Sequence, residues 1–192
     1  MRILYLTLLL CLSLAVNAQT DYRGPGIIYG DNHAFTLYAP LGWVLDNKSA
    51  ADQGIYAVFY PKYETWADAA TVMYANTSGY EKGQNIDSII AFDLGRFIAV
   101  KPDIDIRKMP DQELPNNKTA IIRHIYGDDN GNYEAIAYIA EPKTAVIIVM
   151  TSRTEIDFEK NLPRFNELLE SYEFLTDDDK AIKKMVKEFG GK

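Results

Sequence analysis

The stretch that decides the fold is AFTLYAPLGW, which runs from Ala34 to Trp43. Its first half alternates between two faces from Phe35 onward, which is the pattern of a strand that buries one side. Pro40 has no N–H to give to a sheet, so the strand ends there or lies at an edge. Gly42 permits a sharp reversal, which returns Trp43 to the face of Phe35. We therefore expect the indole to fill the core and not to form an exposed platform for a ligand.

Two longer segments downstream carry apolar residues at helical spacing. The first begins after Asn85, a good N-terminal cap, and reaches Val100 shortly before a proline. The second begins at Thr154, whose hydroxyl can accept the N–H of Asp157. Pro163 lies inside this second segment, so we expect a kink or a late start there.

Runs typical of strands fill most of the remaining chain. An Asn-Gly pair between two of them is a strong hairpin signal, and several runs are apolar on both sides, which favours cover on both faces. Hairpins and separately placed helices predict an α+β fold, in which helices cover both faces of a mainly antiparallel central sheet. The last run is the most apolar and is expected at the centre. The runs are 55–61, 70–75, 104–110, 118–126, 133–141 and 144–152.

Residues 1–18 have the features of a secretory signal peptide. A positive residue is followed by an apolar run that ends at Val16, and Ala18 precedes a cut ahead of Gln19. The run is shorter than the ~20 apolar residues that span a bilayer. An uncleaved anchor and a lipoprotein modified at Cys11 are the alternatives. We expect export to the periplasm or the exterior of a bacterium, with no transmembrane segment in the mature chain.

Composition limits the partners. Loss of the leader removes the only cysteine, so the mature chain has no disulfide and no reactive thiol. The 192-residue chain has a formal net charge of −7 and no Lys/Arg cluster, which argues against nucleic acid or an anionic membrane surface as a partner. We divide the mature chain into an irregular segment 19–33, one domain 34–176 and a short amphipathic helix within 177–192.

The opening stretch and the order of elements resemble the PsbP-like fold family. That family includes the PsbP subunit of photosystem II, a Ran-binding nuclear import factor and exported bacterial proteins of the DcrB type. In the family, a strand with the pattern F-x-x-x-x-P-x-G-W leads into the central sheet, and a late helix ends in a serine and an aromatic residue. The resemblance covers residues 34–176. The matching positions here are Phe35, Pro40, Gly42, Trp43, Ser171 and Tyr172.

The resemblance implies a PsbP-like α/β/α sandwich that serves as a non-catalytic binding or assembly module. Members of the family have different partners, so no site residue is carried over from them. We therefore expect an exported module of the cell envelope, with a protein of the envelope as its partner.

The densest aromatic group lies in YPKYETWADAA, residues 60–70. Rings beside carboxylates on a loop suit a glycan or peptide ligand, because stacking supplies contact area and the acids fix hydroxyls or amines. The alternative is a loop that folds its rings over the edge of the sheet. The candidate ligand-binding residues are Tyr60, Tyr63, Glu64, Trp66 and Asp68.

Signals of catalysis or of a cofactor are weak. His33 and His124 are the only histidines, and we expect His124 in the core or at the edge of a groove, because no catalytic partner motif accompanies it. The GDDNGN turn lacks the spacing of an EF-hand loop, so we expect no metal and no cofactor. A hydrolase with a carboxylate pair is the third hypothesis, after a protein-binding module and a small-ligand binder. It would show a concave site where two acids converge.

Overall fold

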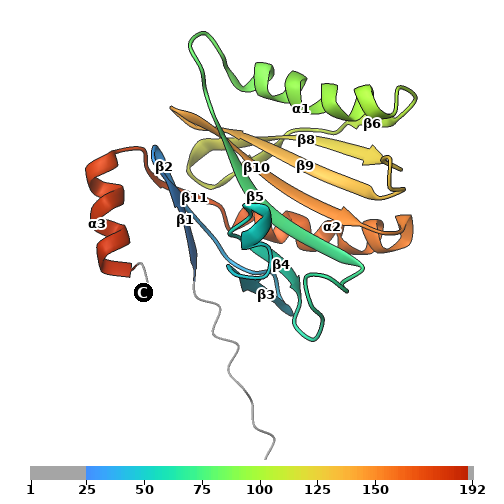
Figure 1. Ribbon diagram of the computed structural model, residues 1–192, viewed down its shortest axis with the longest axis horizontal. Coiled ribbons are helices and arrows are strands. Elements are labelled where there is room, and N and C mark those ends of the chain that lie inside the picture. Colours follow the sequence, from blue (N-terminus) through green and yellow to red (C-terminus); the bar gives the residue numbers. More distant parts are fainter. Residues whose placement is uncertain (1–24, 190–192) are drawn as a thin grey trace, which may run out of the picture.

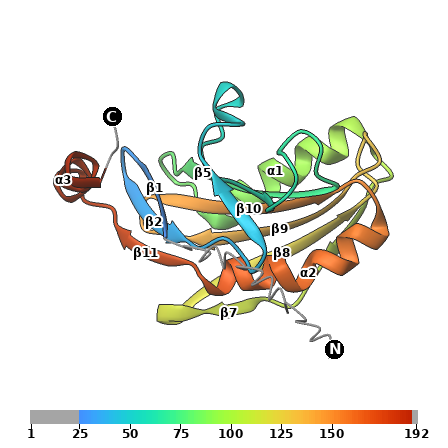
Figure 2. The ribbon, with the colours of Figure 1, turned by 90° about the horizontal axis from the view of Figure 1, so that it is seen from below.

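The structure is a computed structural model that describes residues 25–189. The expected leader and its cleavage site lie outside the described residues. A large sheet forms the middle of the molecule, with α1 (Ile86–Val100) on one side and α2 (Glu155–Glu170) on the other (Figures 1 and 2). A smaller sheet and a third helix, α3 (Asp179–Phe189), lie at one end.

Eight strands form the large sheet, and their pairing is antiparallel throughout the described residues. The order is β3–β4–β5–β10–β9–β8–β6, with β7 paired to β8. The predicted α+β class and antiparallel sheet are confirmed, and β10 has a central place, as its apolar run predicts. The strands are β3 (Trp43–Asp46), β4 (Val58–Pro61), β5 (Thr71–Gly79), β6 (Asp105–Lys108), β7 (Gln112–Leu114), β8 (Lys118–Tyr126), β9 (Tyr133–Ala140) and β10 (Thr144–Ser152).

Two core clusters lie on opposite faces of β9. Odd-numbered residues such as Ala137 pack in the cluster that holds Phe165 and Leu168 of α2. Even-numbered residues such as Tyr138 pack in a second cluster with Ile90 of α1. Because successive side chains of a strand point to opposite faces, each long helix packs on its own side of the sheet.

The turn after Pro40 joins the two sheets. Gly42 has a φ of 81°, the left-handed conformation that a type II turn needs at this position, and the N–H of Trp43 donates to the Pro40 carbonyl at 3.0 Å. Trp43 is 8% exposed and belongs to the α2-side cluster, so the predicted core indole is confirmed. The strand before the turn is β2 (His33–Leu37) of the small sheet, and only β3 after the turn enters the large sheet.

The small sheet has the order β1–β2–β11, with β1 at Gly26–Gly30 and β11 at Glu173–Thr176. The segment 19–33, expected to be irregular, therefore contains a strand in its described part. The reason is a hairpin between β1 and β2, to which β11 adds from the far end of the chain. Such a distant partner leaves no local pattern in the sequence.

Both long helices begin at the predicted caps. The Asn85 side chain accepts a backbone N–H at 3.0 Å, and the Thr154 hydroxyl accepts the N–H of Asp157 at 3.1 Å. α2 starts directly after Thr154, so the alternative of a late start is wrong, and Pro163 stands inside the helix.

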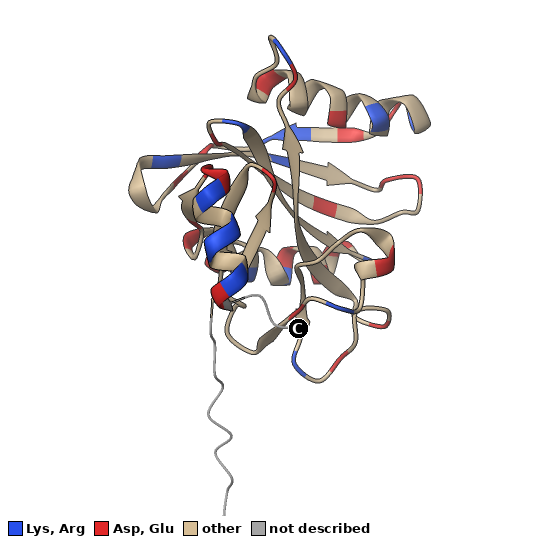
Figure 3. Cartoon of the chain, turned by 60° about the vertical axis from the view of Figure 1, so that its left-hand side comes forward, with Lys and Arg blue, Asp and Glu red and all other residues tan. Residues whose placement is uncertain are grey.

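α3 carries mixed charges on its outer side, as Figure 3 shows, and buries Ile182 against the rest of the protein. Two short 3₁₀ turns, at Ala51–Gln53 and Pro115–Asn117, complete the elements. None of the helices in residues 25–189 combines the length and the apolar character that crossing a membrane requires.

Candidate functional site

The five residues nominated from the sequence lie against different neighbours. The Tyr60 hydroxyl, on β4, donates to Asp46 Oδ2 at 2.7 Å. Trp66 packs edge-on against Tyr74 of β5, with ring centroids 6.3 Å apart. Tyr63 points into solvent with 93% of its surface exposed. The loop thus places one ring in a hydrogen bond, one against the sheet and one in water.

The two nominated acids are exposed, and Asp68 accepts the Thr65 hydroxyl at 2.7 Å within its own turn. Neither these acids nor the three rings line the two cavities described next. The nomination of Tyr60, Tyr63, Glu64, Trp66 and Asp68 stays a prediction.

A cavity of about 510 Å³ lies between the small sheet and the large sheet. Residues 27–30 of β1 line one wall, and residues 75–77 of β5 line another. The connection from β3 to β4 supplies Asn47, Gly54 and Tyr56. The size falls within the range of small-molecule and peptide sites in proteins. We call this space the inter-sheet cavity.

The lining of the inter-sheet cavity carries no Asp, Glu, Lys or Arg among its described residues. Two tyrosines stand at its rim, Tyr29 with 47% and Tyr56 with 65% of their surface exposed. Amide and hydroxyl groups of Asn47, Asn76 and Thr77 supply neutral donors and acceptors. The described lining of the inter-sheet cavity is thus uncharged, although the whole chain has a net charge of −7.

His33 of β2 closes one end of the cavity. Its Nε2 lies 3.5 Å from Thr77 Oγ1, and its Nδ1 lies 3.2 Å from Asn32 Oδ1. Burial lowers the pKa of His33 below 6.5, against the opposing effect of Asp31. The imidazole is therefore mainly neutral at neutral pH. A Cβ on Gly30 would lie 2.5 Å from the His33 ring, so a larger residue there would require the ring to shift.

Thr77, His33 and Asn32 are connected like a nucleophile, a base and an orienting group. However, 3.5 Å is at the limit of a hydrogen bond, and the Thr77 N–H already donates to Asn76 Oδ1 at 2.8 Å. That N–H is therefore occupied and does not stabilise an oxyanion beside the hydroxyl. The arrangement fits binding better than acyl transfer.

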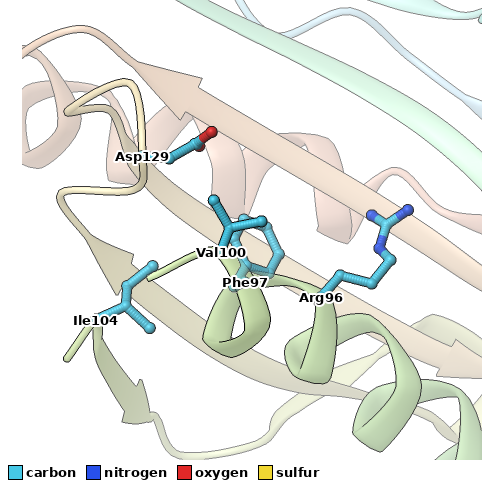
Figure 4. A pocket seen from close by; sticks show the side chains of 5 residues that line it. All are labelled: Arg96, Phe97, Val100, Ile104 and Asp129. Carbon is cyan, nitrogen blue, oxygen red and sulfur yellow. The ribbon is translucent and has the colours of Figure 1, made fainter. Parts of the chain in front are cut away.

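A second cavity of about 300 Å³ lies beneath the C-terminal part of α1 (Figure 4). Arg96, Phe97 and Val100 line it from the helix, Ile104 from the following loop and Asp129 from the β8–β9 turn. The smaller volume makes it a weaker candidate for a ligand site than the inter-sheet cavity.

Glu134 of β9 is buried on the α1 side of the sheet and 9% exposed. Burial, followed by the nearby charges of Asp128 and Asp93, raises its pKa to about 7. Its hydrogen bond from the Thr151 hydroxyl is long, at 3.5 Å. Asp93 is occupied, because it accepts the Tyr138 hydroxyl at 2.7 Å and pairs with Arg96 at 3.0 Å. Glu134, Asp93 and Asp128 line neither cavity. The hypothesis of a hydrolase with a carboxylate pair is therefore supported by one buried acid but by no concave site where two acids converge.

The remaining residues weighed from the sequence have structural roles. His124 is 6% exposed and packs edge-on against Phe158, with centroids 5.1 Å apart, and burial lowers its pKa. Asp128 Oδ1 accepts the N–H groups of Asn130 and Asn132, at 2.8 and 2.7 Å, which builds the predicted hairpin turn.

Sequence reasoning missed the inter-sheet cavity because it treated residues 19–33 as irregular. A signal was present: the apolar run Ile27–Ile28–Tyr29 sits between glycines and precedes an Asp-Asn turn and the alternating strand. Read as a hairpin, it would have placed His33 beside Gly30.

Comparison with known proteins concerns the fold alone. No family model matches the chain, and no curated protein matches it in sequence. Similar solved structures include a mutant of the protein Mog1, with a TM-score of 0.48, 10% identity and coverage of 83% of this chain and 99% of that one. They also include cyanobacterial PsbP (CyanoP) from Synechocystis sp. PCC 6803, with a TM-score of 0.46, 12% identity and coverage of 84% and 99%.

Proposed function

We propose that the protein is an exported, non-catalytic binding module of the bacterial cell envelope, with the inter-sheet cavity as its ligand site. The observation that carries this proposal is a cavity of about 510 Å³ with two tyrosines at its rim and no Asp, Glu, Lys or Arg in the part of its lining that the structure describes. Concave, partly apolar sites with a few neutral polar groups are the usual form of ligand pockets.

The chemistry of the cavity favours binding over catalysis. Among the residues that the structure describes, the titratable side chains in its lining are His33, Tyr29 and Tyr56. General acid–base catalysis needs a correctly protonated partner within reach of the reacting group. The contact of His33 with Thr77 is long, and the Thr77 N–H is already used. A binding module needs none of these features.

Export is supported by the sequence of residues 1–18, with its positive start, apolar run and small residues before Gln19. A mature chain without cysteine is compatible with an oxidising compartment, because it has no thiol to oxidise. Signal-peptide cleavage is checked by N-terminal sequencing of the protein recovered from the periplasm or medium, with Gln19 as the expected first residue.

The aromatic loop nominated from the sequence is the second candidate site. The observation that supports this site is the exposure of Tyr63, which is 93% exposed. Lys62 Nζ lies over the Tyr63 ring, 5.9 Å from its centroid. An exposed ring on a loop is available to a glycan or peptide without rearrangement.

A thermal-shift experiment separates the two sites. A panel of neutral oligosaccharides and of acetylated, amidated uncharged peptides is added to wild type and to four single variants. We expect stabilisation by at least one compound, lost in Tyr56→Ala and Asn47→Ala and kept in Tyr63→Ala and Trp66→Ala. The opposite pattern would move the site to the loop, and turnover of an ester or amide substrate that disappears in Thr77→Val would replace the proposal with an enzyme.

A further inference from the structure

We infer that the inter-sheet cavity takes an extended, uncharged peptide segment of a partner protein, which pairs as an added strand with the free edge of β1. This inference rests on the proposed function and names the class of its ligand. Addition of a strand to an exposed sheet edge is a general mode of peptide recognition, in which backbone hydrogen bonds give affinity and side-chain pockets give specificity.

The cavity reaches the edge of β1 and does not touch one face of the strand alone. Four consecutive residues of the strand, 27–30, line it. Successive side chains point to opposite faces of a strand, so a space that touches all of them lies beside the backbone. β1 is the outer strand of the small sheet and pairs only with β2 among the described residues. Every second residue of β1 therefore turns its N–H and C=O away from β2, toward the cavity side.

The opposite wall is also a strand edge. β4 pairs with β5 only at Tyr74 and Met73, and the bond from Ala75 N–H to the Ala57 carbonyl, 3.0 Å, ends that contact. β5 continues to Gly79, paired with β10 on its other side. Three consecutive residues, 75–77, line the cavity just past the point where β4 stops. The cavity thus separates the unpaired edge of β1 from a stretch of β5 whose N–H groups at Ala75 and Thr77 already donate, to the Ala57 carbonyl and to Asn76 Oδ1.

Both ends of the cavity are closed by contacts between the sheets. At one end, His33 Nε2 lies 3.5 Å from Thr77 Oγ1. At the other, a Cβ on Gly26 would collide with the Leu45 side chain of β3. The open edge between these contacts covers residues 27–30, about 13 Å of extended chain at ~3.3 Å per residue. An added segment of about four residues fits this length.

The lining selects the chemistry of that segment. A charged residue would lose its hydration among neutral groups without gaining an ion pair, because the described lining holds no Asp, Glu, Lys or Arg. Tyr29 and Tyr56 at the rim supply contact area for apolar or hydroxyl side chains. The free edge of β1, with its regularly spaced donors and acceptors, matches a peptide better than a glycan, whose hydroxyls do not repeat at the spacing of a strand.

The test uses the purified chain and a library of acetylated, amidated hexapeptides built from uncharged residues. Binding is measured for wild type, for Tyr56→Ala and for Tyr63→Ala as the matched exposed-tyrosine control. The tightest hexapeptide is then remade twice, with N-methyl groups on its odd residues and on its even residues. Hydrogen–deuterium exchange follows the amides of residues 27–30 in each complex.

We expect one N-methylated set to bind at least about tenfold more weakly and the other set to bind nearly as well, because only alternate N–H groups face the strand edge. Exchange at residues 27–30 should slow in the complex, and Tyr56→Ala should weaken binding while Tyr63→Ala should not. Equal effects of the two N-methylated sets, unchanged exchange, or no binding by any hexapeptide would overturn the inference. If a neutral oligosaccharide such as maltohexaose binds instead and depends on Tyr56, the proposed function stands and only the peptide inference fails. If no compound depends on Tyr56, both fail.

Discussion

His33 on β2 and Thr77 on β5 stand 3.5 Å apart, from Nε2 to Oγ1, and this contact joins the tip of the small sheet to the large sheet. The two residues belong to strands that do not pair with each other. The position of the imidazole therefore sets how closely the sheets approach and fixes one end of the inter-sheet cavity.

Gly30→Ala tests this relationship. A Cβ at residue 30 would lie 2.5 Å from the His33 ring, so the ring must shift from its place beside Thr77. We expect the variant to lose about 1–3 kcal/mol of unfolding free energy, as overpacking does, and to bind any ligand of the cavity more weakly. Urea denaturation measures the first effect and titration the second.

Gly79→Ala is the matched control for Gly30→Ala. Gly79 also ends a strand, and the nearest atom to an added Cβ there is Asn32 Nδ2 at 3.8 Å, an ordinary contact. Its stability should change little. Equal losses in the two variants would show that the His33 contact has no special role.

Trp43→Ala tests the sheet-switching turn. Trp43 is 8% exposed in the main core, and truncation of a buried Trp costs about 3–5 kcal/mol because of lost burial and the cavity left behind. Trp66 is only partly buried and makes an edge-on pair with Tyr74, so Trp66→Ala should cost about 1 kcal/mol. Unfolding free energies of both variants check the difference, and similar values would contradict a core role for Trp43.

Much of the fold could be read from local patterns. The bounds of β10, Thr144–Ser152, match the apolar run, and α1 begins directly after Asn85 as its cap predicts. Periodicity and capping act over a few residues, so the sequence shows them directly. The pairing of β2 with β11 joins residues from the two ends of the domain, and no local pattern predicts it.

The candidate site was harder to predict for the same reason. The aromatic residues are densest in the sequence at residues 60–68, and this density favours a ligand site in that loop. In the structure, however, the three rings lie against different neighbours. The rings of the inter-sheet cavity, Tyr29 and Tyr56, come from separate segments that meet only in the folded structure. Its remaining polar groups are common surface residue types, and only their position beside two strand edges distinguishes them.

Gly95→Ala should stabilise the protein. Gly95 lies inside α1, and a Cβ there would meet no atom within 4 Å. Glycine in a helix interior costs about 0.5–1 kcal/mol relative to alanine because the unfolded chain is more flexible. We expect the free energy of unfolding, measured with urea, to rise by that amount in Gly95→Ala. It should fall by an equal amount in Ala91→Gly, at an exposed position of the same helix. A loss in Gly95→Ala would mean that a side chain at residue 95 meets other atoms of the protein.

Glu134→Gln tests the buried carboxyl on the α1 side of the sheet. Burial and the charges of Asp128 and Asp93 raise the pKa of Glu134 from 4.5 to about 7. Below pH 4.5 the carboxyl is protonated in both the folded and the unfolded chain. Between pH 4.5 and about 7 only the unfolded chain loses the proton, so the contribution of Glu134 to stability falls as the pH rises and then levels off.

We expect Glu134→Gln to have a higher unfolding free energy than wild type, by an amount that depends on pH. At about 1.36 kcal/mol per unit of pKa, the full effect is on the order of 3 kcal/mol, and glutamine removes it while keeping an acceptor for the Thr151 hydroxyl. Urea unfolding of wild type and Glu134→Gln at pH 4.5, 6 and 8 should show the advantage of the variant growing with pH. Glu64→Gln, at an exposed position of the same residue type, is the charge-matched control. An advantage that is constant across these pH values would mean that Glu134 is solvated in the folded protein, with its carboxylate reached by water from the α1 side.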